Sequence, residues 1–315
     1  GMGLDPRRAQ NVASGKGTLW ANCGPSQFHL PHGDVPQVVP GSIGLAYESL
    51  QPLKDRLSTA AATDAKCFKD YEVGIDSKSN REYVRVVDMY GNVFFCRERS
   101  PSPDIISLEV INDDKSTSVQ QQELNQPILT KDDIADDAVE KYGLDVIDKY
   151  RKQVSECLGI DYVEFRVPRK GDTVTKIANF YQFALEAPAQ VVQDGNDKVA
   201  IVGIGAIDSS TGRCSQCLLF RESDESIPEY DGHHVALYCG TNDEDFNDIF
   251  QNCLLAGIVW VNERFSDKVR DLAGAQKAKQ FRFKNILDLK TGETVFTLEH
   301  EIRSVNHDAW PGKAI

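Results

Sequence analysis

The spacing of hydrophobic and polar residues changes in the same way along three segments of this chain. In each segment a strand-like run comes first, residues at helical spacing follow, and further strand-like runs come last. In the third segment, an alternating run over 159–167 predicts a strand, and apolar residues at helical spacing follow it over 174–185. Three further runs, separated by Asp-Gly and Ser-Ser-Thr-Gly turns, predict strands over 189–193, 199–206 and 213–221. This segment therefore predicts the order strand, helix, strand, strand, strand.

The second and fourth segments repeat this order. In the second segment the predicted strands cover four ranges: 42–47, 71–74, 82–88 and 92–97. In the fourth segment they also cover four ranges: 234–239, 258–261, 280–287 and 294–303. The turns before the two last strands are alike, since Asp88-Met-Tyr-Gly91 precedes one and Asp288-Leu-Lys-Thr-Gly292 precedes the other. Repetition at this scale indicates a module that packs against a copy of itself to bury its apolar face.

The N-terminal part of the chain breaks the pattern. Two predicted strands near 18–23 and 26–31 lack the strand and helix that open the other segments. We expect an incomplete leading module with an unpaired sheet edge near Trp20 and Phe28. Such an edge would be covered by another chain, as in a homodimer, or by a helix of the linker.

A polar linker separates the second and third segments. It contains an acidic and Gln-rich run, and then a capping-box-like start at Thr130 that predicts an inserted helix. That helix could bind a partner or act as a solvated spacer. The expected organisation is a partial module plus the first full module over 1–100, the linker and helix over 101–157, and two paired modules over 158–315.

Composition narrows the class of protein. The 315 residues carry a formal net charge of −13, and the pI is near 5.0. This balance argues against a nucleic-acid surface, which needs clustered Lys and Arg. No apolar run reaches the roughly 20 residues of a membrane span, and no secretory signal is apparent. We therefore expect neither a nucleic-acid partner nor a membrane.

The eight cysteines are scattered along the chain. One C-x-x-C motif, Cys214 to Cys217, has no second pair to complete a zinc site. Because it lies in a run that predicts one strand, its two thiols are expected to face opposite sides as small buried hydrophobes. Scattered, unpaired cysteines favour a reducing, intracellular and therefore cytoplasmic location.

The order of elements and the motifs together resemble one superfamily. The opening Gly232-His-His-Val-Ala236 and the closing Asp88-Met-Tyr-Gly-Asn92 are similar to motifs of the vicinal oxygen chelate superfamily. That group includes glyoxalase I, the extradiol dioxygenases and the bleomycin-resistance proteins. Gln27-Phe-His-Leu-Pro and Leu298-Glu-His-Glu-Ile-Arg-Ser304 resemble its glyoxalase-like branch. Apart from the linker, the resemblance covers nearly the whole chain. It implies an α+β fold of tandem βαβββ modules paired into open barrels, with the leading module incomplete.

The same resemblance implies a divalent metal in a cleft between paired modules, held by residues of the first and last strands. Strand alternation places His234 and Tyr238 on one face of the first strand of the fourth segment. Glu299 and Glu301 take the matching face of its last strand. His234 and Glu299 are thus the expected metal ligands, and their donor atoms suit zinc, iron, nickel or manganese. In the alternative, His234 hydrogen-bonds a carboxylate and no metal binds.

The third segment is expected to supply the other side of this cleft. Its first strand presents Tyr162, Glu164 and Arg166 on one face. Tyr162 stands at the expected ligand position, although Tyr is not a usual ligand of this superfamily. We expect substrate contacts from Tyr162, Arg166 and Tyr238, and proton transfer by Glu164 or Glu301. A simpler use of two of these residues is an ion pair between Arg166 and Glu301.

The second segment has lost the ligand positions in this alignment. Ser42 stands where His234 stands, and matching Phe94 with Phe296 puts Arg97 opposite Glu299. Two functions remain open, because this fold hosts lyases, oxygenases, epimerases and plain binders. One is a metal-dependent lyase or oxygenase acting on a small oxygenated molecule between the two C-terminal modules. The other is a non-catalytic protein that binds a small ligand or acts as a scaffold.

Overall fold

A computed structural model describes seven stretches of the chain: residues 3–4, 17–24, 26–63, 67–99, 156–205, 207–208 and 213–307. The predicted linker helix, which begins at Thr130, lies outside these residues. None of the described helices is both long and apolar enough to cross a bilayer. All eight cysteines lie in the described stretches and are free thiols.

The second segment forms the predicted order of elements. Its members are β4 (Gly41–Tyr47), α2 (Gln51–Ala62), β5 (Asp70–Ile75), β6 (Glu82–Val87) and β7 (Val93–Glu98). The helix begins with a proline in its first turn, where the missing N–H costs nothing, and it buries Leu53 and Leu57. The period of the apolar residues was therefore sufficient to predict this segment.

The third segment follows the same order with one correction. Its main members are β8 (Cys157–Pro168), α5 (Thr173–Ala184), β9 (Ala189–Asp194), β10 (Asp197–Gly203) and β13 (Cys217–Ser223). The run predicted as one strand over 213–221 is divided, because β12 (Arg213–Cys214) pairs with β11 (Ile207–Asp208) and a bend precedes β13. The two cysteines of the C-x-x-C motif therefore lie on different strands.

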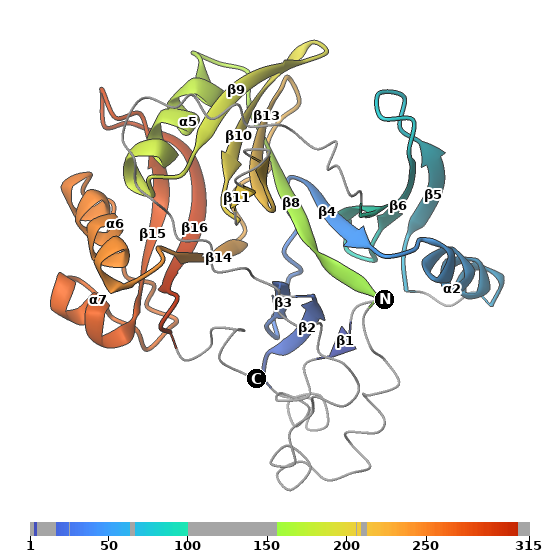
Figure 1. Ribbon diagram of the computed structural model, residues 1–315, viewed down its shortest axis with the longest axis horizontal. Helices are drawn as coiled ribbons and strands as arrows, with labels where there is room; N and C mark the ends of the chain where they lie inside the picture. Colours follow the sequence, from blue (N-terminus) through green and yellow to red (C-terminus); the bar gives the residue numbers. More distant parts are fainter. Residues whose placement is uncertain are drawn as a thin grey trace, which may run out of the picture.

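The second and third segments share one continuous sheet. Its strand order is β5-β6-β7-β4-β8-β13-β10-β9, and the antiparallel pair β4–β8 joins the two segments at their first strands (Figure 1). Glycine permits this close approach, since a Cβ at Gly44 would lie 2.2 Å from the ring of Tyr162. The first strand of each segment thus pairs with its counterpart.

The fourth segment forms a separate, three-stranded sheet. Its members are β14 (His234–Cys239), α6 (Asp243–Leu255), α7 (Leu272–Ala278), β15 (Gln280–Leu287) and β16 (Thr294–Ser304), and its strand order is β14-β16-β15. The predicted strand over 258–261 is reduced to a single bridge between Val259 and Phe283. Asn242 caps α6 by accepting hydrogen bonds from the backbone N–H groups of Glu244 and Asp245.

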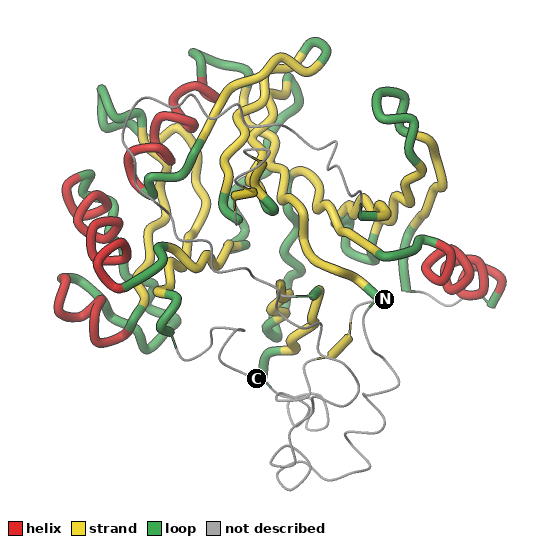
Figure 2. The backbone as a smooth tube through the Cα atoms, viewed as in Figure 1, coloured by secondary structure: helices red, strands yellow, loops and turns green. Residues whose placement is uncertain are grey.

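Helix α5 joins the two sheets (Figures 1 and 2). It contacts β9 and β10 on one side and β15 and β16 on the other. Its buried residues belong to one hydrophobic core that also contains the apolar faces of β8 and β16, where the rings of Phe165 and Phe296 lie 6.1 Å apart. The hydroxyl of Tyr181 forms a 2.6 Å hydrogen bond with Nε2 of the buried His300.

This packing corrects the pairing expected for residues 158–315. The apolar faces of β8 and β16 both point into the core around α5. Because side chains alternate along a strand, the polar faces of these strands point away from that core and from each other. The cleft expected between the polar faces of the third and fourth segments is therefore absent from the described structure. The domain boundaries themselves stay predictions.

The described N-terminal residues form a small sheet in the order β1 (Gly3–Leu4), β2 (Leu19–Cys23) and β3 (Ser26–Leu30). Phe28 packs edge-on against Phe94 of the second segment, with ring centroids 6.0 Å apart. In the described part of the chain, β3 pairs with β2 alone. Coverage of its free edge by a second chain stays a prediction.

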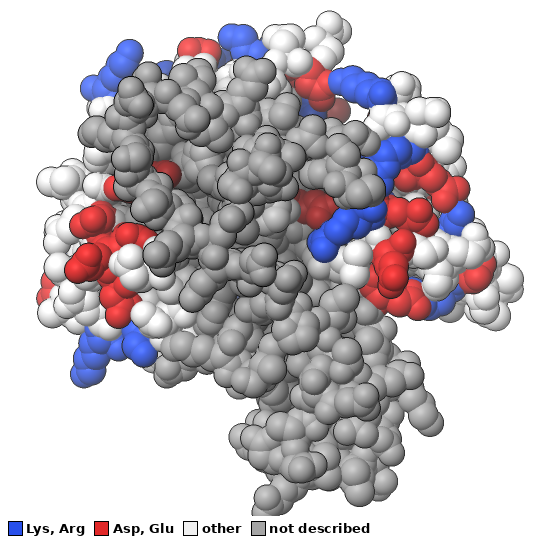
Figure 3. All heavy atoms as spheres, viewed as in Figure 1, with Lys and Arg blue, Asp and Glu red and all other residues white. Residues whose placement is uncertain are grey.

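The visible surface mixes charges of both signs. Figure 3 shows acidic and basic side chains side by side over the region of α2, β5 and β6. Several of them form ion pairs, including Lys54 with Glu82 at 2.8 Å and Arg85 with Asp70 at 3.5 Å. Such interspersed charges keep a surface hydrated without making a field of one sign.

Candidate functional site

The fourth segment brings the expected ligand pair together. β14 and β16 are parallel neighbours in which His234 pairs in register with Glu299, and Ala236 pairs with Glu301. The apolar residues of both strands pack into the core, as their alternation predicts. His234, Glu299 and Glu301 consequently share the opposite face of the sheet.

An arginine from the third strand of this sheet occupies the space between the two carboxylates. Arg282 on β15 reaches Glu299 Oε1 through Nη1 at 3.0 Å and Glu301 Oε2 through Nη2 at 2.6 Å. Its Nε donates to Asp267 Oδ2 at 2.9 Å. The side chain of Arg282 is only 4% exposed, and its guanidinium lies 4.0 Å from the centre of the Phe265 ring. We call these four charged residues, Arg282, Glu299, Glu301 and Asp267, the Arg282 cluster.

The two glutamates of the cluster have further partners. Asn262 Nδ2 donates to both oxygens of Glu299 at 3.0 Å. Glu301 accepts a hydrogen bond from Arg303 Nε at 2.6 Å. Burial alone would raise the pKa of Glu301, but Arg303 and Arg282 outweigh it and lower that pKa. Glu301 is therefore an ionised member of a paired network.

Burial has the largest effect on His234 and lowers its pKa, although Glu299 and Glu301 act in the opposite direction. A neutral imidazole could serve as a metal ligand. The carboxylates beside it, however, are already paired with a buried guanidinium. In the described part of the chain, no group of three or more His, Cys, Asp or Glu residues is arranged to hold a metal ion. As they stand, these donors do not fit a divalent metal.

Arg282 was missed by the sequence analysis, although a signal for it exists. The stretch Gln280-Phe-Arg-Phe-Lys alternates polar and aromatic residues, which places Arg282 on the polar face of its strand. With β15 next to β16 in the sheet, that face is the one that carries Glu299 and Glu301. The order of the strands was the missing information.

Tyr238 lies on the same strand face as His234. Its hydroxyl accepts a 3.0 Å hydrogen bond from Arg303 Nη1. Ala236, between these two aromatic residues on β14, is exposed, whereas His234 and Tyr238 are half-buried. Ala236 is therefore an exposed position with a small side chain on a polar face that is otherwise largely buried.

The candidate residues of the third segment lie apart from this group. Glu164 forms an ion pair with Arg221 at 3.0 Å. Tyr162 is hydrogen-bonded to Ser42, and burial raises the pKa of Tyr162 to about 12. The expected ion pair between Arg166 and Glu301 is wrong, since Arg166 pairs with Glu225. Glu301 is instead paired within its own sheet. The roles assigned to these residues in catalysis or substrate binding stay predictions.

A second residue missed in the sequence is Asp161, next to Tyr162. The register of β8 against β4 shifts beside it, between Gly44 and Leu45. Burial raises the pKa of Asp161 to about 6, against the opposing effect of Arg99, Arg97 and Arg81. The eight-stranded sheet therefore carries a carboxyl group that titrates close to neutral pH.

The observed register also changes the comparison between the two repeated segments. Ala46 pairs with Arg97 in the second segment, and Tyr238 pairs with Arg303 in the fourth. If Ser42 matches His234, then Arg97 matches Arg303, and the position of Glu299 falls on Val93. The expected match of Arg97 with Glu299 is thus wrong, while the absence of a ligand pair in the second segment still follows.

No protein-family model matches this chain, and no curated protein sequence matches it. Its fold is similar to that of glyoxalase I from Zea mays, with 10% identity, a TM-score of 0.46, and coverage of 91% of this chain and 78% of that chain. A putative dioxygenase from Bacillus subtilis has 14% identity and a TM-score of 0.43, covering 91% of this chain and 73% of the other.

A shorter structure is also similar in part. It is a mutant of a fosfomycin resistance protein from Listeria monocytogenes, complexed with manganese(II), with 13% identity and a TM-score of 0.28; the match covers 46% of this chain and 90% of that one. Similarities this low indicate nothing about activity or ligands. The α+β architecture of tandem βαβββ units stands on the order and pairing of the strands.

Proposed function

We propose that this chain binds a small polar molecule on the β14–β16 face, and that it does so without a metal ion. The observation that carries this proposal is the Arg282 cluster, in which a guanidinium takes the place between Glu299 and Glu301 that a cation would need. A metal would have to enter beside an existing buried positive charge, at carboxylates whose oxygens already accept hydrogen bonds from Arg282, Asn262 and Arg303.

The exposure of Ala236 supports ligand binding on the same face. His234 and Tyr238 flank it on β14, and each offers a hydrogen-bonding group and an aromatic surface. A small molecule with hydroxyl or carbonyl oxygens fits these partners. In this arrangement the ion-paired and hydrogen-bonded cluster forms the floor of the site, and the protein carries out no chemical step on the ligand.

A metal-dependent lyase or oxygenase is the second candidate. The in-register pairing of His234 with Glu299 favours it, because it is the pair that the superfamily resemblance implies. In such an enzyme, Glu164 or Glu301 was expected to transfer a proton. Of the two, Glu164 lies in the other sheet, in an ion pair with Arg221.

Metal content separates the two candidates. We expect elemental analysis of the full chain, purified without chelators, to give far less than one metal per chain in wild type, His234→Ala and Glu299→Gln alike. About one equivalent of metal in wild type, lost in both variants, would establish the second candidate and overturn the first.

Ligand binding needs a separate test. Hydroxyacetone and lactate are suitable probes, titrated against wild type and Ala236→Trp by NMR. We expect saturable binding of the probe to wild type. Binding should be lost in Ala236→Trp, where the indole covers this part of the β14–β16 face. The matched control is Ala61→Trp at an exposed position on α2. Equal binding by all three proteins would place the ligand elsewhere.

A further inference from the structure

A histidine next to the Arg282 cluster is held in a different way. His233 precedes β14, and its Nδ1 lies 2.7 Å from Asp231 Oδ1. The backbone N–H of His233 donates to the same oxygen at 3.1 Å. The side chain of His233 is 10% exposed. Asp231 thus fixes both the backbone and the ring of His233.

Asp231 is in turn anchored to a distant part of the chain. Its Oδ2 accepts a 2.7 Å hydrogen bond from the backbone N–H of Val38, and its carbonyl accepts one from Gln37 Nε2 at 3.2 Å. Burial would raise the pKa of Asp231, but the hydrogen bonds from Val38 and His233 outweigh it and lower that pKa. An ionised carboxylate can only accept, so Nδ1 of His233 is the nitrogen that carries the proton.

The other ring nitrogen of His233 is left without a partner. Nε2 is buried and has no hydrogen bond within the described part of the chain. The ring is confined by Phe165, stacked at 5.9 Å between centroids, and by Tyr230 at 5.2 Å. In the neutral ring, which carries its one proton on Nδ1, Nε2 presents a lone pair. A buried acceptor of this kind without a donor is uncommon in a folded protein and calls for a specific explanation.

A pocket of about 340 Å³ is lined by this histidine. On the side of the eight-stranded sheet its wall includes Pro40 and Pro168, and Phe296 of β16 adds an aromatic surface. Tyr230 and Thr297 also belong to the lining. The pocket is of a size for a small organic molecule, with a mainly apolar wall and few polar groups.

We propose that this pocket binds a small alcohol or phenol whose hydroxyl group donates a hydrogen bond to Nε2 of His233. The apolar wall takes the hydrocarbon part of the ligand, and the fixed lone pair selects molecules with a donor. This site does not include His234 or Arg282, and its proposal does not rest on the function proposed above, although the Tyr230 hydroxyl in its lining donates a 3.4 Å hydrogen bond to Glu299 Oε2.

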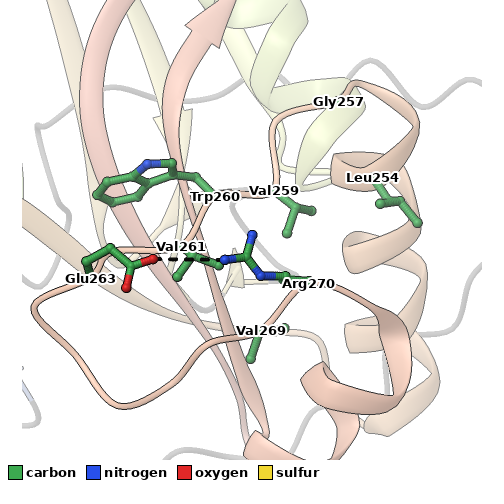
Figure 4. A pocket seen from close by; sticks show the side chains of 8 residues that line it. All are labelled: Leu254, Gly257, Val259, Trp260, Val261, Glu263, Val269 and Arg270. Carbon is green, nitrogen blue, oxygen red and sulfur yellow. Dashed lines mark ion pairs between the residues drawn. The ribbon is translucent and has the colours of Figure 1, made fainter.

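A second pocket lacks the feature that carries this proposal. It has a volume of about 410 Å³ and lies beside α6, with Leu254, Trp260 and Arg270 in its lining (Figure 4). Arg270 pairs with Glu263 at 3.9 Å, and both side chains are largely exposed. These solvated charges pair with each other and with water, whereas the buried Nε2 of His233 has no hydrogen-bond partner in the described part of the chain.

The test uses two probes of nearly the same shape. 4-Methylphenol carries the required donor, and p-xylene has a methyl group in place of the hydroxyl. We expect the full chain to bind 4-methylphenol at least about tenfold more tightly than p-xylene, the effect of one buried hydrogen bond. The ¹⁵N resonance of His233 Nε2 should shift on addition of 4-methylphenol and stay in place with p-xylene.

Three variants control this experiment. His233→Phe should remove the preference for 4-methylphenol, and Asp231→Asn should weaken it because the tautomer is no longer fixed. His32→Phe should keep it, since this exposed histidine lies outside the pocket. Near-UV circular dichroism establishes that each variant is folded. Three outcomes would each overturn the proposal. The two probes could bind with equal affinity, the preference for 4-methylphenol could survive in His233→Phe, or the site could hold ordered water only and bind neither probe.

Discussion

The polar faces of the two sheets differ in how deeply their ion pairs are buried. On the fourth-segment sheet, Glu299 and Glu301 are at most 5% exposed and share one buried arginine. On the eight-stranded sheet, the ion pairs are more open: in the pair of Arg97 with Asp76 the side chains are 22% and 25% exposed. Within the described residues no ion pair holds the partly buried Asp161 of that sheet.

This difference shows what a candidate ligand set needs besides the right residues. Both faces carry carboxylates at positions where strand alternation points them out of the core. Whether such a carboxylate can take a metal or a proton depends on the strand next to it. Arg282 holds the carboxylates of Glu299 and Glu301 in buried ion pairs. In contrast, burial raises the pKa of Asp161 to about 6.

The largest expected effect concerns Arg282. Arg282→Ala leaves two buried glutamates without their shared cation, so we expect the free energy of unfolding to fall by about 3–5 kcal/mol. The matched change on the other sheet, Arg97→Ala, breaks a partly exposed pair and should cost about 1 kcal/mol or less. Chemical denaturation of both variants at pH 7 measures the difference. Similar losses in the two variants would contradict the distinction between the faces.

The second effect is a dependence of stability on acid. Burial lowers the pKa of His300 to about 3, from about 6.5 for an exposed histidine. Between these values the unfolded chain binds a proton that the folded chain does not. This contribution to stability is therefore fully present above about pH 6.5 and falls by about 1.4 kcal/mol for each pH unit below it.

The register of the second segment suggests the variant that removes this effect. Phe94 stands there at the place of His300, since Ile43 pairs with Phe94 and Val235 pairs with His300. Because Tyr181 would lose its partner, we suggest the double variant Tyr181→Phe with His300→Phe. The difference in unfolding free energy between wild type and this variant should shrink as pH falls from 6.5 to 4.5. A constant difference would mean that His300 does not titrate as expected.

The smallest effect concerns Asp161 and has the opposite sign. Its folded pKa of about 6 lies above that of an exposed aspartate, so its stabilising contribution is complete at low pH and is lost as pH rises through about 6. Asp161→Asn should therefore stabilise the protein at pH 8 by up to about 3 kcal/mol relative to wild type. At pH 4 the two proteins should unfold alike. Equal stability at both pH values would refute the raised pKa.

Much of the fold could be predicted because the signals are local. The apolar period over 174–185 gave α5, and the period-2 run over 280–287 matches β15 residue for residue. The run over 213–221 failed because the break between β12 and β13 arises from the pairing of β12 with β11. The reduced strand near Val259 likewise depends on its neighbours in space.

The pairing of segments could not be predicted from periodicity. A βαβββ unit has an edge at its first strand and an apolar surface on its helix side, and both can join it to a copy. The sequence does not say which copy meets which surface. The edge joins β8 to β4, and the helix side joins the third segment to the fourth, so Tyr162 and Glu301 belong to separate faces.

For the candidate site, residue types on a strand face were predictable and their partners were not. His234, Glu299 and Glu301 meet as the alternation indicates. Arg282 lies 17 residues before Glu299, beyond a turn, and its effect on these carboxylates depends on the geometry of the sheet. The surroundings of the buried His233 ring depend on Phe165 of the third segment as well as on its near neighbours Tyr230 and Asp231.

Helix α5 has a consequence for how this chain folds. Seven of its twelve residues are buried, and they contact elements on two sides rather than one. A helix of this kind cannot complete its surroundings until the last two strands of the chain are in place. A chain that ends before β15 would leave the apolar surface of α5 exposed to water and to other chains. The third and fourth segments should therefore unfold together in one cooperative step, although no strand of one is hydrogen-bonded to a strand of the other in the described structure.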